Sequence, residues 1–261
     1  MDVNALFSVA GKTAIVTGGS RGIGYMIATG LLSSGAKVYI TARKAAACDR
    51  AAEELSEIGE CVSIPADLST SEGLAGFTKA FAEQEDRLHI LCNNAGANWV
   101  APLGEMPESG FDKVIDINLK SPFFLTQSLL PLLKAAGSAE DPARIIMTGS
   151  INGIAVPTFI DNFSYSASKA GIHMLARHIG QRLAKDHVTV NSIAPGPFES
   201  QMTAAALDGD GRKMVESIVP MGRIGTPEDM AGTVLFLASR AGAFINGATI
   251  PVDGGITGFA G

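Results

Sequence analysis

The sequence predicts an α/β protein of one domain, built on a doubly wound parallel sheet. Short β-type apolar runs alternate with longer segments of helical periodicity through most of the 261 residues. The N-terminal part, residues 12–41, reads as strand, glycine-rich turn, helix and strand, which is a βαβ unit. Such units favour a right-handed crossover and parallel strands. The chain length suits one large α/β domain, and without a repeat or a linker we expect residues 1–261 to form a single one.

The first βαβ unit is marked by its start and stop signals. Residues 12–17 are a short β-type run that ends abruptly in glycines. A periodic apolar segment then continues through Leu31 and Leu32 to the stop signal at Ser34 and Gly35. The next β-type run, residues 37–41, completes the unit.

The later elements follow the same alternation. Further strands are expected at 60–66, 88–92, 144–148 and 188–193. Further helices are expected at 45–58, 71–85, 112–136 and 165–185. In a doubly wound sheet, ligands bind at the carboxyl ends of the strands. The turn at Gly18, the pair Asn93-Asn94, Ser150 and Pro195-Gly196 all follow strands, so we expect a binding site there.

The glycines between the first strand and helix are typical of a dinucleotide site. Small residues let the backbone approach a pyrophosphate, and the N-terminus of the following helix offers free N–H groups. The spacing Gly18-x-x-x-Gly22-x-Gly24 departs from the commoner Gly-x-Gly-x-x-Gly, but its place between strand and helix strengthens the prediction.

The end of the second strand bears on cofactor choice. NAD-binding proteins usually place an Asp or Glu there to accept from the ribose 2′-hydroxyl, whereas this chain has Arg43 and Lys44. Two cations and no acid suit a 2′-phosphate, and Arg21 in the glycine turn adds a third positive group. The plainer alternative for Arg43 and Lys44 is a solvated helix start.

A tyrosine and a lysine stand four residues apart at the start of the helix expected at 165–185. On a helix these positions share a face, so the Lys169 ammonium can approach the Tyr165 phenol and lower its pKa from about 10 toward neutrality. Such a tyrosine can pass a proton to or from a substrate oxygen. Taken alone, the pair reads equally as an ordinary surface contact.

Composition excludes several classes of protein. The net charge is −6 without a basic block and aromatic residues make up 6%, which argues against nucleic acid and anionic membranes as partners. The first residues lack a secretory pattern, and no apolar run is long enough to span a membrane. The 3 cysteines are widely spaced, which indicates reduced thiols in a cytoplasmic protein. No metal site is expected, since Asp208 and Asp210 read as a polar turn rather than a calcium loop.

Six motifs occur in order along the chain, and together they resemble the motif set of the short-chain dehydrogenase/reductase family. They are Thr17-Gly18-x-x-x-Gly22-x-Gly24, Asn93-Asn94-Ala95-Gly96, Asn118, Ser150, Tyr165-x-x-x-Lys169 and Pro195-Gly196. The resemblance covers essentially the whole chain and implies a Rossmann-type fold that binds NADP(H). Within the family, segments 17–24, 64–69 and 218–223 are most similar to the NADPH-dependent β-ketoacyl (3-oxoacyl) reductases, especially those of the rhamnolipid-pathway type.

The resemblance implies a role for each catalytic candidate. Tyr165 would protonate the developing alkoxide, and Lys169 would lower its pKa and bind the nicotinamide ribose. Ser150 would hold the substrate carbonyl oxygen, and Asn118 would steady a water that relays protons to Lys169.

The resemblance also implies which residues bind the cofactor. The adenine would meet Asp67 and Leu68, the ribose region Asn94, and the carboxamide end the segment 195–200. The full expected set is Gly18, Ser20, Arg21, Gly22, Ile23, Gly24, Arg43, Lys44, Asp67, Leu68, Asn94, Ala95, Gly96, Tyr165, Lys169, Pro195, Gly196, Phe198 and Ser200.

Two departures from the family pattern stand out. The loop from Ser150 to Tyr165 is longer than usual, which could shift the identity of the catalytic serine. Ser200 stands where a threonine is more usual, but the hydroxyl survives.

The segment 198–221 is expected to form a small substrate lid. It is rich in apolar residues, and in the family the corresponding insert covers the substrate. These residues are Met202, Ala204, Ala205, Ala206, Leu207, Met214, Val215, Ile218 and Met221. An equally weighted alternative is two short helices packed on the body for stability.

Two of the expected helices, 112–136 and 165–185, carry apolar residues on more than one face. Examples are Phe123, Phe124, Leu129, Leu132, Ile172, Met174, Leu175 and Ile179. Extra apolar faces would stay exposed in a monomer. The resemblance implies pairing of these helices and a second interface near Asp253, so we expect a homotetramer.

The leading functional interpretation is an NADPH-dependent reductase of a 3-oxoacyl thioester or a related apolar ketone. The helix end at 182–187 offers little positive charge to an acidic carrier protein, so small-molecule and coenzyme A thioesters are expected to be the better substrates. A polyol or sugar-acid dehydrogenase of the same family is the second interpretation. From another class, the chain could be a catalytically silent NADPH-binding scaffold or sensor.

Overall fold

A single parallel sheet forms the centre of the protein. The computed structural model describes residues 1–157, 160–200, 203–204 and 207–259. Within these residues, seven strands pair in the order β3-β2-β1-β4-β5-β6-β7, every pair parallel. They are β1 (Thr13–Thr17), β2 (Lys37–Thr41), β3 (Cys61–Ser63), β4 (Ile90–Asn93), β5 (Ala143–Thr148), β6 (Val188–Pro195) and β7 (Thr249–Val252). The order runs outward in both directions from β1 and β4, which confirms the doubly wound sheet.

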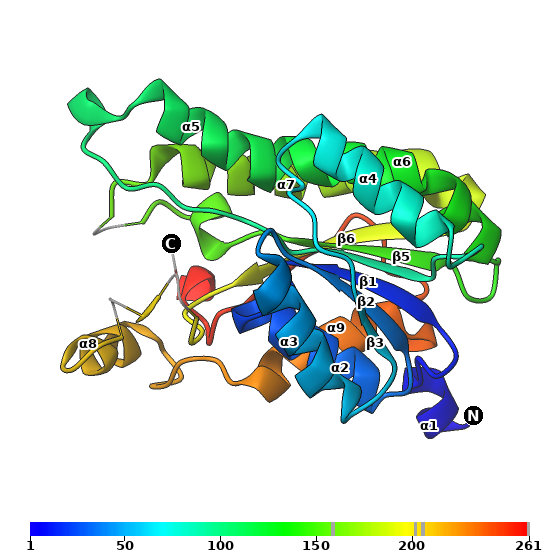
Figure 1. Cartoon of the computed structure of the whole chain (residues 1–261). Helices are drawn as coiled ribbons and strands as arrows, with labels where there is room; N and C mark the ends of the chain where they lie inside the picture. The colour runs from blue at the N-terminus through cyan, green and yellow to red at the C-terminus, as the bar shows by residue number, and fades with distance from the viewer. Residues whose placement is uncertain (158–159, 201–202, 205–206, 260–261) are drawn as a thin grey trace.

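Helices cover both faces of the sheet (Figure 1). On one face lie α4 (Ser71–Ala82), α5 (Glu108–Ile115), α6 (Ser121–Ala136) and α7 (Phe163–Leu183). On the other lie α2 (Gly22–Ser33), α3 (Ala45–Ser56) and α9 (Pro227–Ala238). The short α1 (Val3–Phe7) precedes the sheet, and α8 (Gly211–Ile218) lies off its edge. None of the described helices is long and apolar enough to cross a bilayer.

Alternate residues of each central strand point into two separate cores. Ala14 and Val16 of β1 pack with α2, α3 and α9, whereas Ile15 packs with α4, α6 and α7. All of β1 is buried, as are β4, β5 and β6. Strands buried on both faces read as continuous apolar runs, which is why the sequence predicted them clearly.

One expected helix is divided. Residues 112–136 were expected to form a single helix, but α5 begins at Glu108, a π-helical turn follows at Asp116–Lys120, and α6 continues from Ser121. The expected start at 112 is therefore wrong by one turn, because Pro107 precedes the helix and Glu108 lies in its first turn. A π-helical turn is frequently a feature of a functional site, and this one carries Asn118.

Besides the short α1, two elements were not predicted from the sequence. The helix α9 follows a capping box made by Thr226 and Asp229, with Pro227 in its first turn. The strand β7 adds to the edge of the sheet beside β6, where Pro251 is tolerated because an edge strand bonds on one side only.

The segment 198–221 leaves the body after β6. Among its described residues, α8 is a short helix with no buried residue, and Met214, Ile218 and Met221 are all more than half exposed. Three of the apolar residues expected in the lid, Met202, Ala205 and Ala206, lie outside the described residues.

Candidate active site

The predicted site residues lie where parallel strands end. Strand β5 ends at Thr148 and is followed by Gly149 and Ser150. Its neighbours end at Asn93 and Pro195, and Thr17 ends β1 beyond Asn93. Because all these strands run in one direction, their following residues gather at one edge of the sheet, as expected.

The structure brings Ser150, Tyr165 and Lys169 together. The Ser150 side chain lies close enough to the Tyr165 phenol to lower its pKa. Nζ of Lys169 lies 5.4 Å from the centroid of the Tyr165 ring. Contact with Ser150 across the long connection means that the loop length has not moved this serine away from the tyrosine.

The electrostatics of Tyr165 differ from the expectation. Burial raises the pKa of Tyr165, and the neighbouring Ser150 side chain offsets this only in part. Lys169 is 4% exposed, and its Nζ donates to the main-chain oxygen of Thr148 at 2.7 Å. Burial lowers the pKa of Lys169 from 10.5 to about 8. The expectation that Lys169 pulls the pKa of Tyr165 toward neutrality is therefore wrong for the protein alone, because loss of water dominates for both groups.

Asn118 joins this cluster from the π-helical turn. Its Oδ1 accepts from the N–H of Ala97 at 2.8 Å, and its Nδ2 donates to the Ala97 oxygen and to Ser168 Oγ, each at 3.0 Å. A Cβ on Gly96 would lie 3.1 Å from Asn118 Oδ1 and 3.7 Å from Lys169 Nζ. The Asn118 side chain is thus engaged by protein groups, and any side chain at 96 would press against its Oδ1.

The glycine turn is shaped to receive a phosphate group. Gly18 and Gly22 adopt positive φ angles of 68° and 54°, which favour glycine. Helix α2 begins at Gly22, and its cap residue Arg21 makes no side-chain capping bond. The first N–H groups of α2 therefore remain available to an anion. This geometry fits the pyrophosphate of a dinucleotide.

Asn94 and Ala95 support the turn from the neighbouring strand. Nδ2 of Asn94 donates to the Thr17 oxygen at 2.9 Å. The main-chain N–H groups of Asn94 and Ala95 both donate to Thr17 Oγ1, at 2.8 and 2.9 Å. A Cβ on Gly24 would lie only 2.2 Å from the Gly18 oxygen, so glycine is required for α2 to pack on the turn. Ser20 completes the turn, and Ile23 packs against the core beneath it.

The end of β2 presents two exposed cations, Arg43 and Lys44. Arg43 lies close enough to Asp67 to influence it: burial raises the pKa of Asp67, but hydrogen bonds from Ser69 and the charge of Arg43 together hold it below its usual range. Asp67 Oδ1 accepts from Ser69 N and Oγ at 3.0 and 2.6 Å. Its position beside Arg43 fits the expected adenosine end of a dinucleotide.

Three of the expected cofactor residues, Leu68, Phe198 and Gly196, offer no exposed side chain to a ligand. Leu68 and Phe198 are 3% and 2% exposed and belong to the two hydrophobic cores. At Gly196 a Cβ would lie 2.8 Å from the Cα of Asp253, so this glycine permits close packing at the end of β7. Leu68, Phe198 and Gly196 can therefore contact a cofactor only through main-chain atoms or by shaping the wall.

Ser200 brings the segment after β6 over the glycine turn. A Cβ on Gly22 would lie 3.2 Å from Ser200 Cβ. Between these parts lies a cavity of about 1080 Å³, whose lining includes Arg21, Tyr25, Leu207 and Arg223. The segment 198–221 is thus positioned beside the proposed phosphate site.

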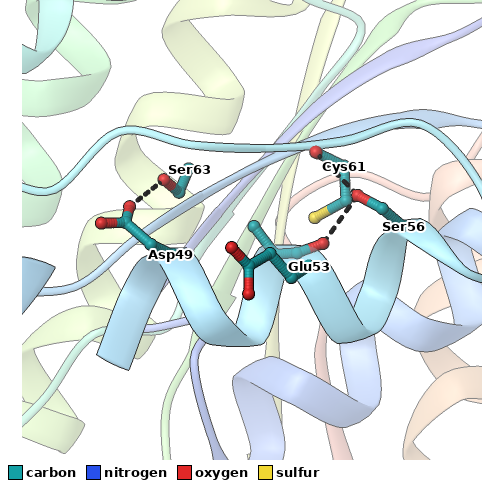
Figure 2. Close-up of a pocket in the computed structure, with 6 residues that line it drawn as sticks. Asp49, Glu53, Ser56, Cys61 and Ser63 are labelled. Carbon is teal, nitrogen blue, oxygen red and sulfur yellow. Dashed lines mark hydrogen bonds between the residues drawn. The ribbon is translucent and has the colours of Figure 1, made fainter. Parts of the chain in front are cut away.

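A smaller hollow of about 440 Å³ lies elsewhere, between α3 and β3 (Figure 2). Asp49 accepts from Ser63 there, and Ser56 Oγ donates to the oxygens of Ala52 and Cys61 at 2.7 and 3.2 Å. These groups are paired with one another at the outer edge of the sheet, far in strand order from β5 and β6. We assign this hollow a structural role only.

The sequence-based prediction missed two groups beside the site. The Thr148 carbonyl accepts a hydrogen bond from Lys169 Nζ, and His173 Nε2 contacts the main-chain oxygen of Ser150. A main-chain carbonyl leaves no trace in a sequence. His173 could have been noticed, because it continues the four-residue spacing of Tyr165 and Lys169. No group of three or more His, Cys, Asp or Glu side chains in the described residues is arranged to hold a metal ion.

Known proteins resemble this chain over nearly its full length. The family model described as "Enoyl-(Acyl carrier protein) reductase" matches residues 18–257. The rhamnolipids biosynthesis 3-oxoacyl-(acyl-carrier-protein) reductase of Pseudomonas aeruginosa is 48% identical over 250 residues, which are 95% of this chain and 97% of that protein. The 2-dehydro-3-deoxy-D-gluconate 5-dehydrogenase of Pseudoalteromonas atlantica is 36% identical, over 95% of this chain and 97% of that protein. The solved structure named "Pseudomonas aeruginosa RhlG/NADP active-site complex" superposes with a TM-score of 0.94 at 47% identity, and covers 97% of this chain and 99% of that one.

Proposed function

The chain belongs to the short-chain dehydrogenase/reductase family, and on that premise we propose that it is an NADPH-dependent carbonyl reductase acting on a 3-oxoacyl thioester or a related apolar ketone. One observation carries the proposal. Ser150, Tyr165 and Lys169 meet at the strand ends, on a chain 48% identical to a 3-oxoacyl reductase.

The proposed chemistry assigns binding and proton transfer to the protein. NADPH supplies the hydride when bound. The Ser150 hydroxyl donates a hydrogen bond to the substrate carbonyl oxygen and so stabilises the negative charge that develops there. Tyr165 gives its phenolic proton to the same oxygen. Because burial raises the pKa of Tyr165, the phenol is protonated at neutral pH, which is the state that an acid needs in the direction of reduction.

Lys169 and Asn118 are proposed to assist proton transfer by Tyr165 without contacting the substrate. With a pKa of about 8, Lys169 is mostly charged at pH 7 yet can exchange a proton near that pH. Its charge would stabilise the phenolate left after proton transfer. The Asn118 side chain already bonds Ala97 and Ser168, so a relay water would have to be steadied by its main chain rather than by its amide.

The proposed preference for NADPH over NADH rests on the end of β2. Arg43 and Lys44 are exposed there, and no acid occupies the position that would accept from a ribose hydroxyl. Arg21 lies in the adjacent turn. A solved relative is named as an NADP complex at a TM-score of 0.94, which supports the same cofactor.

The proposed substrate is apolar. The segment 198–221 exposes Met214, Ile218 and Met221, and an acyl chain packed against these side chains would remove apolar surface from water. Sugar hydroxyls in the same place would lose water without a replacement partner. The second candidate is a sugar-acid dehydrogenase, because one relative at 36% identity has that activity in its name.

We further propose a cytoplasmic homotetramer. Three aromatic side chains on the helical face made by α5 and α6 are more than a third exposed, namely Phe111, Phe123 and Phe124, and Met174 of α7 is 60% exposed. Apolar groups of this size favour burial against a second copy. The cytoplasmic location is supported by Cys48, Cys61 and Cys92, which are free thiols whose pKa burial raises to about 11, 12 and 12.

The experiment is a turnover panel. NADPH oxidation is followed with 3-oxoacyl thioesters on coenzyme A and on carrier protein, the matching enoyl thioesters, and keto sugar acids. We expect the coenzyme A ketones to give the highest kcat/KM, because α7 ends in a mixed-charge segment where Asp186 already pairs with Lys134. Reduction of the enoyl thioesters alone, or of keto sugar acids, would move the assignment to those activities. NADPH binding without any turnover would favour a silent scaffold.

A further inference from the structure

His173 is a buried histidine that the proposed chemistry does not use. It lies on α7 one turn after Lys169 and two turns after Tyr165, so the three side chains share one face of the helix. Its side chain is 5% exposed. Nε2 lies 3.1 Å from the main-chain oxygen of Ser150, and Nδ1 lies 2.9 Å from Ser192 Oγ.

The partners of the ring determine where its proton lies. The Ser150 carbonyl can only accept, so Nε2 must carry the proton and donate it. Nδ1 of the neutral ring then accepts from the Ser192 hydroxyl, which in turn lies 2.9 Å from Thr249 Oγ1 on β7. Burial lowers the pKa of His173, and the nearby charges of Lys169 and Arg177 lower it further. The hydrogen bond to Ser150 raises the pKa but does not outweigh them, so the neutral ring is favoured.

The backbone before Ser150 is fitted to this ring. A Cβ on Gly149 would lie 2.0 Å from Cε1 of His173, so the imidazole occupies the space that any other side chain at 149 would take. Ser150 is held at three further points. Its main-chain oxygen also accepts from the N–H of Gly153 at 3.0 Å, its Oγ accepts from the N–H of Asn152 at 3.2 Å, and its side chain lies beside Tyr165. His173 and Gly153 therefore both hold the main-chain oxygen of the serine, while Asn152 and Tyr165 lie against its hydroxyl.

We propose that His173 is a positioning residue for the reduction: its Nε2–H holds the Ser150 carbonyl, and the chain through Ser192 to Thr249 keeps the ring in the tautomer that can do so. This inference rests on the proposed function, since it assigns Ser150 the substrate oxygen. Without the bond, the Ser150 carbonyl keeps only the hydrogen bond from the Gly153 N–H at 3.0 Å, and the serine can shift. A shift of about 1 Å in the serine hydroxyl would cost roughly a hundredfold in rate.

The test compares three substitutions at one position. His173→Leu removes both ring nitrogens at similar volume. His173→Gln keeps an N–H near the place of Nε2, and His173→Asn carries an amide that is too short to reach Ser150. We expect kcat to fall about thirtyfold in the Leu and Asn variants and within about threefold in the Gln variant. NADPH affinity, read from the fluorescence of Trp99, should stay within twofold. His178→Leu, an exposed histidine on the same helix, is the matched control.

A double-mutant cycle separates positioning from mere support of the fold. In a Ser150→Ala background, His173→Asn should have almost no further effect on kcat, because the group that it positions is gone. An equal loss in both backgrounds would overturn the proposal. So would full activity in His173→Asn, or a Gln variant no better than Asn. The Gln and Asn pair keeps the test decisive if the Leu variant does not fold.

A second measurement does not depend on turnover. The chain has 4 histidines, so selective ¹⁵N labelling resolves their rings by NMR. We expect His173 to be the neutral Nε2–H tautomer at pH 7, and Ser192→Ala to disturb it. A charged ring or the Nδ1–H tautomer would overturn the inference even if the reductase activity stands. An inactive wild-type protein with the expected tautomer would instead leave the contact intact and refute the proposed function.

Discussion

The buried charge of Lys169 should lower the free energy of unfolding of the protein. The pKa of Lys169 falls from 10.5 to about 8 because the ammonium is buried, which corresponds to a cost of about 3 kcal/mol whenever the side chain is charged. Lys169→Met keeps the length of the side chain and removes the charge. It also removes the 2.7 Å hydrogen bond to the Thr148 oxygen, and an acceptor left without a partner costs about 1–3 kcal/mol. At pH 7 the inactive variant should therefore be as stable as the wild type, or up to about 2 kcal/mol more stable.

The pH dependence isolates the charge. A lysine whose folded pKa is lowered binds fewer protons in the folded state between pH 8 and 10.5, so its cost is fully present below about pH 8 and disappears as the pH rises to 10.5. The lost hydrogen bond does not titrate in this way. Urea unfolding of both proteins, at one protein concentration and at pH 7, 8.5 and 10, should show the stability of the Met variant relative to the wild type falling by about 2.5 kcal/mol, so that the variant is the less stable protein at pH 10.

Lys185→Met, at an exposed position just after α7, is the control for losing one lysine and should show no such trend. A stability difference between Lys169→Met and wild type that stays constant with pH, or grows as the pH rises, would refute the reasoning. It would mean that Lys169 is not charged and buried at neutral pH.

Three further predictions concern the cofactor, the assembly and acid stability. Arg43→Asp should lower the ratio of NADPH to NADH affinity by roughly tenfold to a hundredfold, or invert it, because a carboxylate that accepts from a ribose hydroxyl replaces a cation that binds the 2′-phosphate. Equal affinity for both cofactors in the unmodified protein would contradict this. Light scattering at micromolar concentration should give a tetramer, and Phe124→Asp should lower the mass by placing a charge on an apolar face; a monomeric wild type would contradict it. Nδ1 of His89 accepts from the N–H of Thr13 at 3.0 Å, and burial together with Lys12 lowers its pKa below 6.5. Stability should therefore fall as the pH drops below 6.5, and His89→Asn, which can still accept but does not titrate, should lose less; identical pH profiles would count against this reasoning.

The sheet could be predicted because its central strands are buried on both faces. Such strands appear as uninterrupted apolar runs, and β2 was predicted residue for residue at 37–41. The helix α9 was missed although its capping box at Thr226 and Asp229 is visible in the sequence, whereas two other features carry weaker signals. β7 is a short, half-exposed edge strand that includes Pro251, and the π-helical turn at 116–120 has the same apolar periodicity as its neighbours.

The candidate site could be predicted as a set of residues but not as an electrostatic environment. The spacing of Tyr165 and Lys169 places them on one helical face, and the structure agrees. Spacing does not reveal burial, so the raised pKa of Tyr165 and the lowered pKa of Lys169 were not foreseen. The roles of Leu68, Phe198 and Gly196 were likewise hidden, because packing against the core depends on segments far away in the sequence.

The proposed reduction is tested by following the transferred hydride and by removing the proton donor Tyr165 in the same assay. The protein is incubated with a 3-oxoacyl coenzyme A thioester and NADPH deuterated at its transferable position, and the product is analysed by mass spectrometry. We predict a 3-hydroxyacyl thioester carrying one deuterium at C3, and a rate at least a hundredfold lower for Tyr165→Phe with NADPH binding nearly unchanged. A product without deuterium, or a Tyr165→Phe variant that retains more than a few per cent of the rate, would contradict the account.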